Sequence, residues 1–91
     1  MTSLIEISYL EEYKLELHFS NNSYGVIDFK YLLDKNTSLT NQLKDIAYFK
    51  NNFIDFGALC WKNGLELSAE SLYEKLVSSE TLKQSQDAKV A

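Results

Sequence analysis

Hydrophobic and polar residues alternate along the first third of the chain. In residues 5–9 and again in residues 13–19, every second residue is large and hydrophobic, which is typical of strands with one buried face. Only residues 10–12 separate the two runs, so we expect an antiparallel hairpin whose register keeps both hydrophobic sets on one face. Asn21 and Asn22 tolerate left-handed backbone, so a turn there predicts a third strand over residues 24–27.

Helical spacing replaces this alternation in the middle of the chain. Asp28 is a candidate N-cap for a short helix over residues 29–33. Ser38 or Thr40 can cap a second short helix. Its hydrophobic positions at helical spacing are Leu39, Leu43 and Ile46 or Ala47. Both helices are too short to be stable without a sheet beneath them.

Gly57 separates two further hydrophobic runs, residues 53–56 and 58–61. This pattern predicts either a tight hairpin or one strand bent at a glycine bulge, and we prefer the hairpin. The side chains of the pair are large, so we expect it to be buried on more than one side, in or near the centre of the sheet.

The last helix has the strongest start signals. Asn63-Gly64 indicates a turn, Ser68 occupies an N-cap position, and Glu70 and Lys75 match the helix dipole. The hydrophobic positions that follow repeat at helical spacing and predict a core-facing stripe: Ala69, Leu72, Tyr73, Leu76 and Val77.

These elements predict an α+β fold with an antiparallel five-stranded meander-type sheet, in the order β-β-β-α-α-β-β-α, and helices packed on one face. A chain of 91 residues with 45% hydrophobic content supports one core, so we expect a single α+β domain over residues 1–79. Residues 80–91 are expected to form a polar C-terminal tail or an extension of the last helix, anchored by Leu82 and Val90.

The net charge of −4 has the wrong sign for a surface that neutralises phosphates, so we expect no direct nucleic acid binding. This acidity serves either solubility or steering toward a basic protein partner. The N-terminal segment lacks the pattern of a signal peptide, and no hydrophobic run approaches the length of a membrane span. We therefore expect a cytoplasmic protein that does not associate with a membrane.

Few side chains of this sequence are suited to catalysis or to metal binding. We expect neither a catalytic site, nor a cofactor, nor a bound metal. Cys60 lies between Leu59 and Trp61 and is expected to fill space in the core, as is the lone Trp61. His18 alternates in phase with polar residues, which indicates a solvated strand face. The alternative roles are a nucleophile for Cys60, a base for His18 and an interface anchor for Trp61.

The polar face of the first hairpin and any open sheet edge are the surfaces on which we expect a partner protein to bind. Tyrosines add contact area there if they reach solvent. The candidate partner-binding residues are Tyr9, Tyr13, Lys14, Glu16, His18 and Tyr24, and Tyr48 is a further tyrosine of this kind.

Several stretches resemble the bacterial domain of unknown function 2442 (DUF2442) over about residues 4–76. The stretches are Tyr13-x-Leu15-x-Leu17-x-Phe19, Val26-Ile27-Asp28-Phe29-x-x-Leu32-Leu33, Phe49 ahead of the Gly57 hairpin, and Trp61-x-Asn63-Gly64-x-Glu66-Leu67-Ser68-x-Glu70-x-Leu72-Tyr73. The family usually has Pro where this chain has Ala69, and often has an Asp-Gly turn where it has Asn22-Ser23.

The resemblance implies a small α+β unit without defined catalytic residues, often encoded beside a second small protein in a toxin-antitoxin-like arrangement. Some relatives carry a helix-turn-helix domain, which these residues do not predict. Our leading hypothesis is a non-enzymatic interaction module, an antitoxin-like or accessory member of such a pair, whose partner is another small protein encoded nearby. The alternatives are a homodimeric structural or small-ligand-sensing unit, and an enzyme with a site around Cys60.

Overall fold

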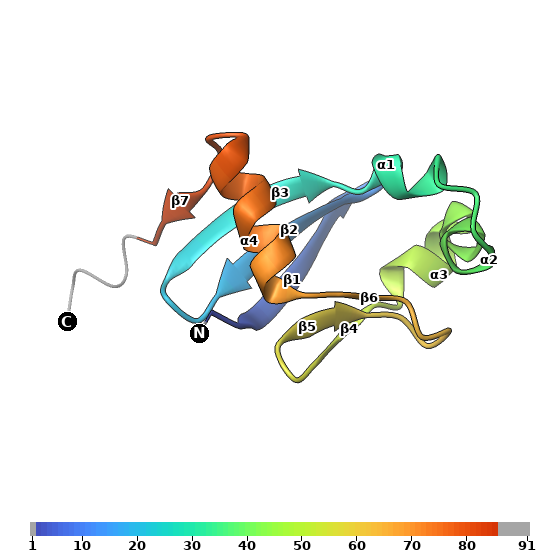
Figure 1. The fold of residues 1–91 in the computed structure, drawn as a ribbon, viewed down its shortest axis with the longest axis horizontal. Coiled ribbons are helices and arrows are strands. Elements are labelled where there is room, and N and C mark those ends of the chain that lie inside the picture. The colour runs from blue at the N-terminus through green and yellow to red at the C-terminus, as the bar shows by residue number, and fades with distance from the viewer. Residues whose placement is uncertain (1, 86–91) are drawn as a thin grey trace.

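Two antiparallel sheets form the framework of the protein in the computed structural model, which describes residues 2–85 (Figure 1). The first sheet has the order β1-β2-β3-β7 and comprises β1 (Leu4–Glu11), β2 (Lys14–Phe19), β3 (Ser23–Asp28) and β7 (Lys83–Gln84). The second has the order β4-β5-β6 and comprises β4 (Phe53–Asp55), β5 (Ala58–Cys60) and β6 (Glu66–Leu67). The helical elements are α1 (Lys30–Leu33), α2 (Ser38–Asn41), the 3₁₀ turn η1 (Gln42–Lys44), α3 (Ile46–Lys50) and α4 (Ala69–Ser78).

The α+β class, the initial three-stranded meander and the Gly57 hairpin are confirmed, but the single five-stranded sheet is wrong. The hairpin β4–β5 belongs to a separate sheet, because β6 returns after the Asn63-Gly64 turn and pairs with β5. A partner only a few residues away closes a short loop, which carries a small entropy penalty. The backbone contact between the hairpin and the first sheet is the hydrogen bond from Leu4 N–H to the Gly57 carbonyl, at 2.9 Å.

Strand β1 follows the predicted register only in its centre. Ile7 lies opposite Leu17 as expected, but the pairing with β2 is irregular between Leu4 and Glu6 and again between Tyr9 and Glu11. Each irregularity adds one residue to β1, as in a β-bulge. The expectation that Ile5 joins the buried set is wrong, because the first bulge displaces it from the alternation and leaves it 61% exposed.

The predicted second helix is interrupted. Thr37, and not Ser38 or Thr40, caps α2, since its hydroxyl accepts from Thr40 N–H at 3.0 Å. Asp45 then takes up an extended conformation and caps α3 by accepting from Ala47 N–H at 3.0 Å. The continuous helix is therefore wrong, because two separate caps specify two short helices.

The cap predicted for α1 makes the expected contact. Asp28 precedes α1, and its carboxylate accepts from Lys30 N–H at 3.0 Å, although the residue at the N-cap position is Phe29. The helix itself begins one residue later than predicted, at Lys30.

Helix α4 crosses one face of the first sheet (Figure 1). Ser68 caps it by accepting from Ser71 N–H at 3.1 Å, and Leu72 and Leu76 are buried, as predicted. Val77 is 50% exposed, so its expected place in the buried stripe is wrong. After α4 the chain forms β7 beside β3, and Leu82 packs against the core, whereas Val90 lies outside the described residues.

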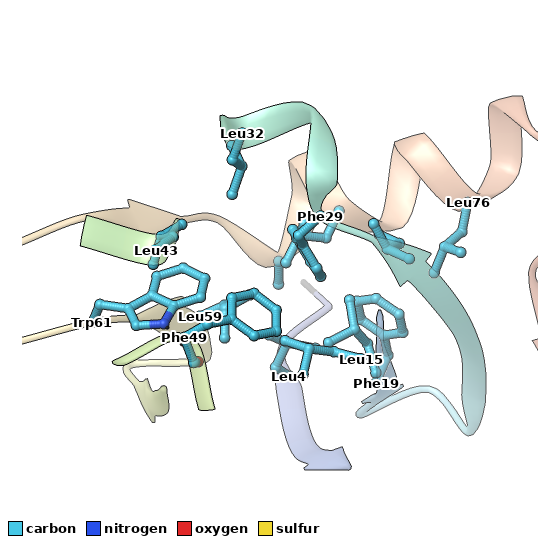
Figure 2. Close-up of a cluster of buried hydrophobic side chains, with 14 residues drawn as sticks. Leu4, Leu15, Phe19, Phe29, Leu32, Leu43, Phe49, Leu59, Trp61 and Leu76 are labelled. Carbon is cyan, nitrogen blue, oxygen red and sulfur yellow. Dashed lines mark hydrogen bonds between the residues drawn. The ribbon is translucent and has the colours of Figure 1, made fainter. Parts of the chain in front are cut away.

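A single hydrophobic core connects both sheets and the helices. It extends from Trp61 and Leu43 at one end to Phe19 and Leu76 at the other (Figure 2). Trp61 is buried as predicted, and its indole N–H donates to the Phe49 carbonyl at 2.9 Å. The core therefore joins the second sheet to α3 through a polar contact as well as through hydrophobic packing.

Candidate functional site

One face of the first sheet points away from α4, and we call it the open face. The strand register places ten residues on it: Glu6, Ser8, Glu11, Lys14, Glu16, His18, Tyr24, Val26, Asp28 and Lys83. All ten are exposed or half-buried. The opposite face of the same strands carries Leu15, Leu17 and Ile27, which lie in the core. The alternation that buries one face thus leaves the other accessible to solvent or to another molecule.

A compact side-chain cluster lies at the centre of the open face. Glu16 Oε1 and His18 Nε2 are 2.9 Å apart. The His18 ring stacks on the Tyr24 ring, with centroids 5.3 Å apart and planes within 11° of parallel. Val26 lies opposite Glu16 and is 42% exposed, which makes it a hydrophobic surface beside the aromatic stack.

A shallow groove of about 240 Å³ adjoins this cluster at the β3–β7 end of the face. Its lining residues are Glu16, Tyr24, Gly25, Val26, Thr81 and Lys83. The lining therefore combines an ammonium group, a carboxylate and a phenol ring with the hydrophobic side chain of Val26. Such a mixture suits noncovalent recognition by a protein surface more than the enclosure of a small ligand, which needs a deep and largely apolar cavity.

The structure brings together four of the six predicted partner-binding residues, Lys14, Glu16, His18 and Tyr24. The other two, Tyr9 and Tyr13, lie on the opposite side of the sheet, since Tyr9 is in register with the buried Leu15.

Both of these tyrosines contact the Phe49 ring edge to face, with centroid distances of 6.5 Å for Tyr9 and 4.9 Å for Tyr13. The Tyr13 hydroxyl also donates to the Lys44 carbonyl at 2.9 Å. Burial and the Asp45 carboxylate raise its pKa. Tyr48 likewise serves the fold, because its hydroxyl accepts from Asn63 N–H at 2.9 Å.

Sequence reasoning missed Val26 and Glu6 as members of this surface. The phase of the alternation was the available signal, because Val26 and Glu6 fall in step with the polar positions of their strands. A single exposed hydrophobic residue is common on protein surfaces, so Val26 is of interest only together with the stack of His18 on Tyr24 beside it.

Cys60 and His18 do not converge, since they belong to different sheets. Cys60 is 7% exposed, which confirms its predicted burial. Its pKa is raised by burial and by the carboxylates of Glu66 and Asp55, while a backbone hydrogen bond at Asp55 opposes part of that shift. A thiol in these surroundings is a poor nucleophile near neutral pH.

Two kinds of functional feature are absent from residues 2–85. No three His, Cys, Asp or Glu residues gather there in a way that could hold a metal ion. No helix in this part of the chain has both the length and the hydrophobicity to cross a membrane.

Comparison with known protein families assigns the chain to one of them. The family model described as "Protein of unknown function (DUF2442)" matches residues 4–78. The chain belongs to the DUF2442 family. Comparison with curated proteins and with solved structures returned no match. This family description assigns no activity to DUF2442 proteins.

Proposed function

We propose that this DUF2442 protein is a non-enzymatic interaction module that binds another small protein through its open face. The observation that carries the proposal is the one-sided cover of the first sheet. Helix α4 and the core bury one face, while the other presents Val26 and the stack of His18 on Tyr24. An aromatic pair beside an exposed aliphatic side chain, with charged residues around both, has the composition of a reversible protein interface.

The charge of the open face favours a different protein over a second copy of the chain. Its carboxylates are Glu6, Glu11, Glu16 and Asp28, and its ammonium groups are Lys14 and Lys83. In a twofold dimer the same patch meets itself, so its excess of negative charge repels. Edge pairing through β1 is also disfavoured, because two bulges interrupt its regular backbone.

The partner that we propose is the small protein encoded beside this one, with the DUF2442 chain as the antitoxin-like or accessory member of the pair. The gene arrangement implied by the family resemblance supports this assignment. The electrostatics agree with it in one respect, because a face with excess carboxylates attracts a basic partner and repels nucleic acid.

Co-expression with the neighbouring gene product tests the proposal. Val26→Glu places a charge in the centre of the open face, and we expect it to weaken the complex by about tenfold or more. Val77→Glu is the matched control, since Val77 is similarly exposed but lies on α4. This control should bind as the wild type does, at low and at raised salt.

Three results would contradict the proposal. The first is the absence of a complex at every ionic strength, and the second is an equal loss of binding in both variants. The third is a homodimer in light scattering that Val26→Glu converts to a monomer, because that result assigns the open face to a second copy of the chain.

A further inference from the structure

The tip of the β4–β5 hairpin carries the most exposed large hydrophobic residue of the described chain. Phe56 is 99% exposed, and it occupies the left-handed region with φ of 50°, followed by Gly57 with φ of 77°. Two successive residues with positive φ form the kind of tight turn that favours Asn-Gly. A phenylalanine in the first position is unfavourable for the backbone and gains nothing from burial.

The position of this tip is fixed by its neighbours. The Gly57 carbonyl accepts from Leu4 N–H at 2.9 Å, which ties the turn to the start of β1. A Cβ atom on Gly57 would lie 2.8 Å from Ser3 Cβ, so the backbone of the turn packs closely against the segment before β1. The Phe56 ring therefore projects from a held backbone, which lowers the entropy lost when a ligand contacts it.

A groove lies beside the ring. One hollow of about 180 Å³ extends between Phe56 and the first turn of α4, and an adjoining hollow of about 270 Å³ shares Thr2 and Glu70 with it. The charged residues that line the two hollows are Glu66, Glu70 and Glu74, and neither a lysine nor an arginine lines them. We call this surface, together with Phe56 and its neighbour Asp55, the hairpin groove.

None of the carboxylates of the hairpin groove forms an ion pair within residues 2–85, although Lys62 lines a further hollow together with Asp55 and Glu66. The ion pairs of this part of the chain involve Glu11, Glu12 and Glu16. The Glu70 carboxylate lies in the first turn of α4, where the helix dipole stabilises a negative charge. The presence of this one acidic residue is therefore explained without a ligand. That explanation does not extend to Asp55, Glu66 or Glu74, nor to the exposed ring.

We infer that the hairpin groove binds an arginine side chain on a partner protein. A guanidinium group stacks on an aromatic ring and donates to carboxylates at the same time, which matches a phenyl ring beside Glu66 and Glu70. Lysine satisfies the charge but lacks the planar group that stacks. The net charge of −4 attracts such a partner from a distance. This surface shares no residue with the open face, so the inference does not depend on the proposed function.

Titration with acetylated tetra-arginine amide, followed by nuclear magnetic resonance at low salt, tests this inference. We expect the largest shift changes at Phe56, Glu66 and Glu70, with tetra-lysine binding about threefold more weakly. Phe56→Ala and the double variant Glu66→Gln/Glu70→Gln should each weaken tetra-arginine binding by about tenfold. Asp34→Asn/Glu80→Gln is the control, because it removes the same charge from exposed residues that line neither hollow.

A second substitution at the tip separates binding from folding. Phe56→Asn suits the left-handed backbone, so this variant should keep or raise the unfolding midpoint while it loses tetra-arginine binding as Phe56→Ala does. The inference is overturned if the shift changes scatter over all acidic residues, if the control double variant loses as much affinity as the groove variant, or if both Phe56 variants bind normally.

Discussion

Gly25 and Leu76 set the distance between helix α4 and the first sheet. A Cβ atom added to Gly25 would lie 2.7 Å from Leu76 Cδ2, closer than nonbonded carbon atoms approach. Gly25 lies opposite Leu17 on the core face of β3, and Leu76 is fully buried above it. A glycine in a strand interior often marks such a close approach, because it has no side chain to separate the two elements.

Substitution of this pair should therefore be strongly non-additive. Gly25→Ala should lower the free energy of unfolding by about 1–3 kcal/mol through overpacking. Leu76→Ala should lower it by about 2–5 kcal/mol through the cavity that it leaves. In the double variant the new methyl group enters that cavity, so the combined loss should be smaller than the sum. Urea denaturation of the four proteins measures the coupling, and additive losses would mean that the two side chains do not compete for one space.

The sequence pattern predicts the long elements of the fold and misses the short ones. Alternation predicted the meander, and a cap with helical spacing predicted α4, because these elements are long enough to repeat their pattern. Strands β6 and β7 have only two residues each, which is too few for any periodicity. The second sheet is completed by β6 and the first by β7, so the sequence pattern could not reveal the full membership of either sheet.

The candidate site was partly predictable, because alternation along a strand assigns its residues to one face or the other. The phase of alternation placed Lys14, Glu16 and His18 on one face, and the register of β3 adds Tyr24. That same phase assigns Tyr9 to the core side, so the expectation that it reaches the partner surface rested on residue type alone. Phe56 gave no signal, since a hydrophobic run around a glycine does not show which residue occupies the turn.

Trp61 and Asn52 share one acceptor, the Phe49 carbonyl, at 2.9 Å and 3.1 Å. Trp61→Phe should lower the free energy of unfolding by about 2–3 kcal/mol, while the Asn52 amide still satisfies the carbonyl. Asn52→Ala should lower it by about 1 kcal/mol. The double variant leaves a buried acceptor without a partner, so its loss should exceed the sum by about 1–2 kcal/mol. Urea denaturation followed by circular dichroism tests this, and a loss equal to the sum would contradict it.

Asn63 joins the second sheet to the helical segment through its side chain. Its amide group donates to the Leu39 carbonyl at 3.1 Å and to Gln42 Oε1 at 2.6 Å, while its carbonyl oxygen accepts from Leu65 N–H at 3.0 Å. Asn63→Asp keeps the last bond but directs a charged oxygen at two acceptors. We expect a loss of about 1–3 kcal/mol in the free energy of unfolding at neutral pH.

The control for this substitution is Asn41→Asp, which adds the same charge at an exposed position in α2. It should change the free energy of unfolding by no more than about 0.5 kcal/mol. Equal losses in the two variants would show that added negative charge, and not the loss of the Asn63 donors, destabilises the protein.

We expect Cys60 to make the free energy of unfolding depend on pH in the alkaline range. Because burial and the Glu66 and Asp55 carboxylates raise its pKa, the folded protein keeps a proton that the unfolded chain releases above its ordinary pKa of about 8.5. The stabilisation from the protonated thiol is complete below that pH and is lost as the pH rises toward the folded pKa. We therefore expect the free energy of unfolding to fall from about pH 8.5, by at most about 1.4 kcal/mol per pH unit.

Cys60→Ala isolates this effect, because it removes the titrating group and leaves the nearby carboxylates in place. Its free energy of unfolding should differ from that of the wild type by a constant amount below about pH 8, and the difference should shrink as the pH rises above about 8.5. Near pH 10 and above both proteins should lose stability, since the pKa values of Tyr13 and Tyr31 are also raised by burial. Urea denaturation across this range provides the measurement. Parallel curves throughout would show that the thiol titrates alike in the folded and unfolded states, and would reopen the possibility that Cys60 is an accessible, reactive residue.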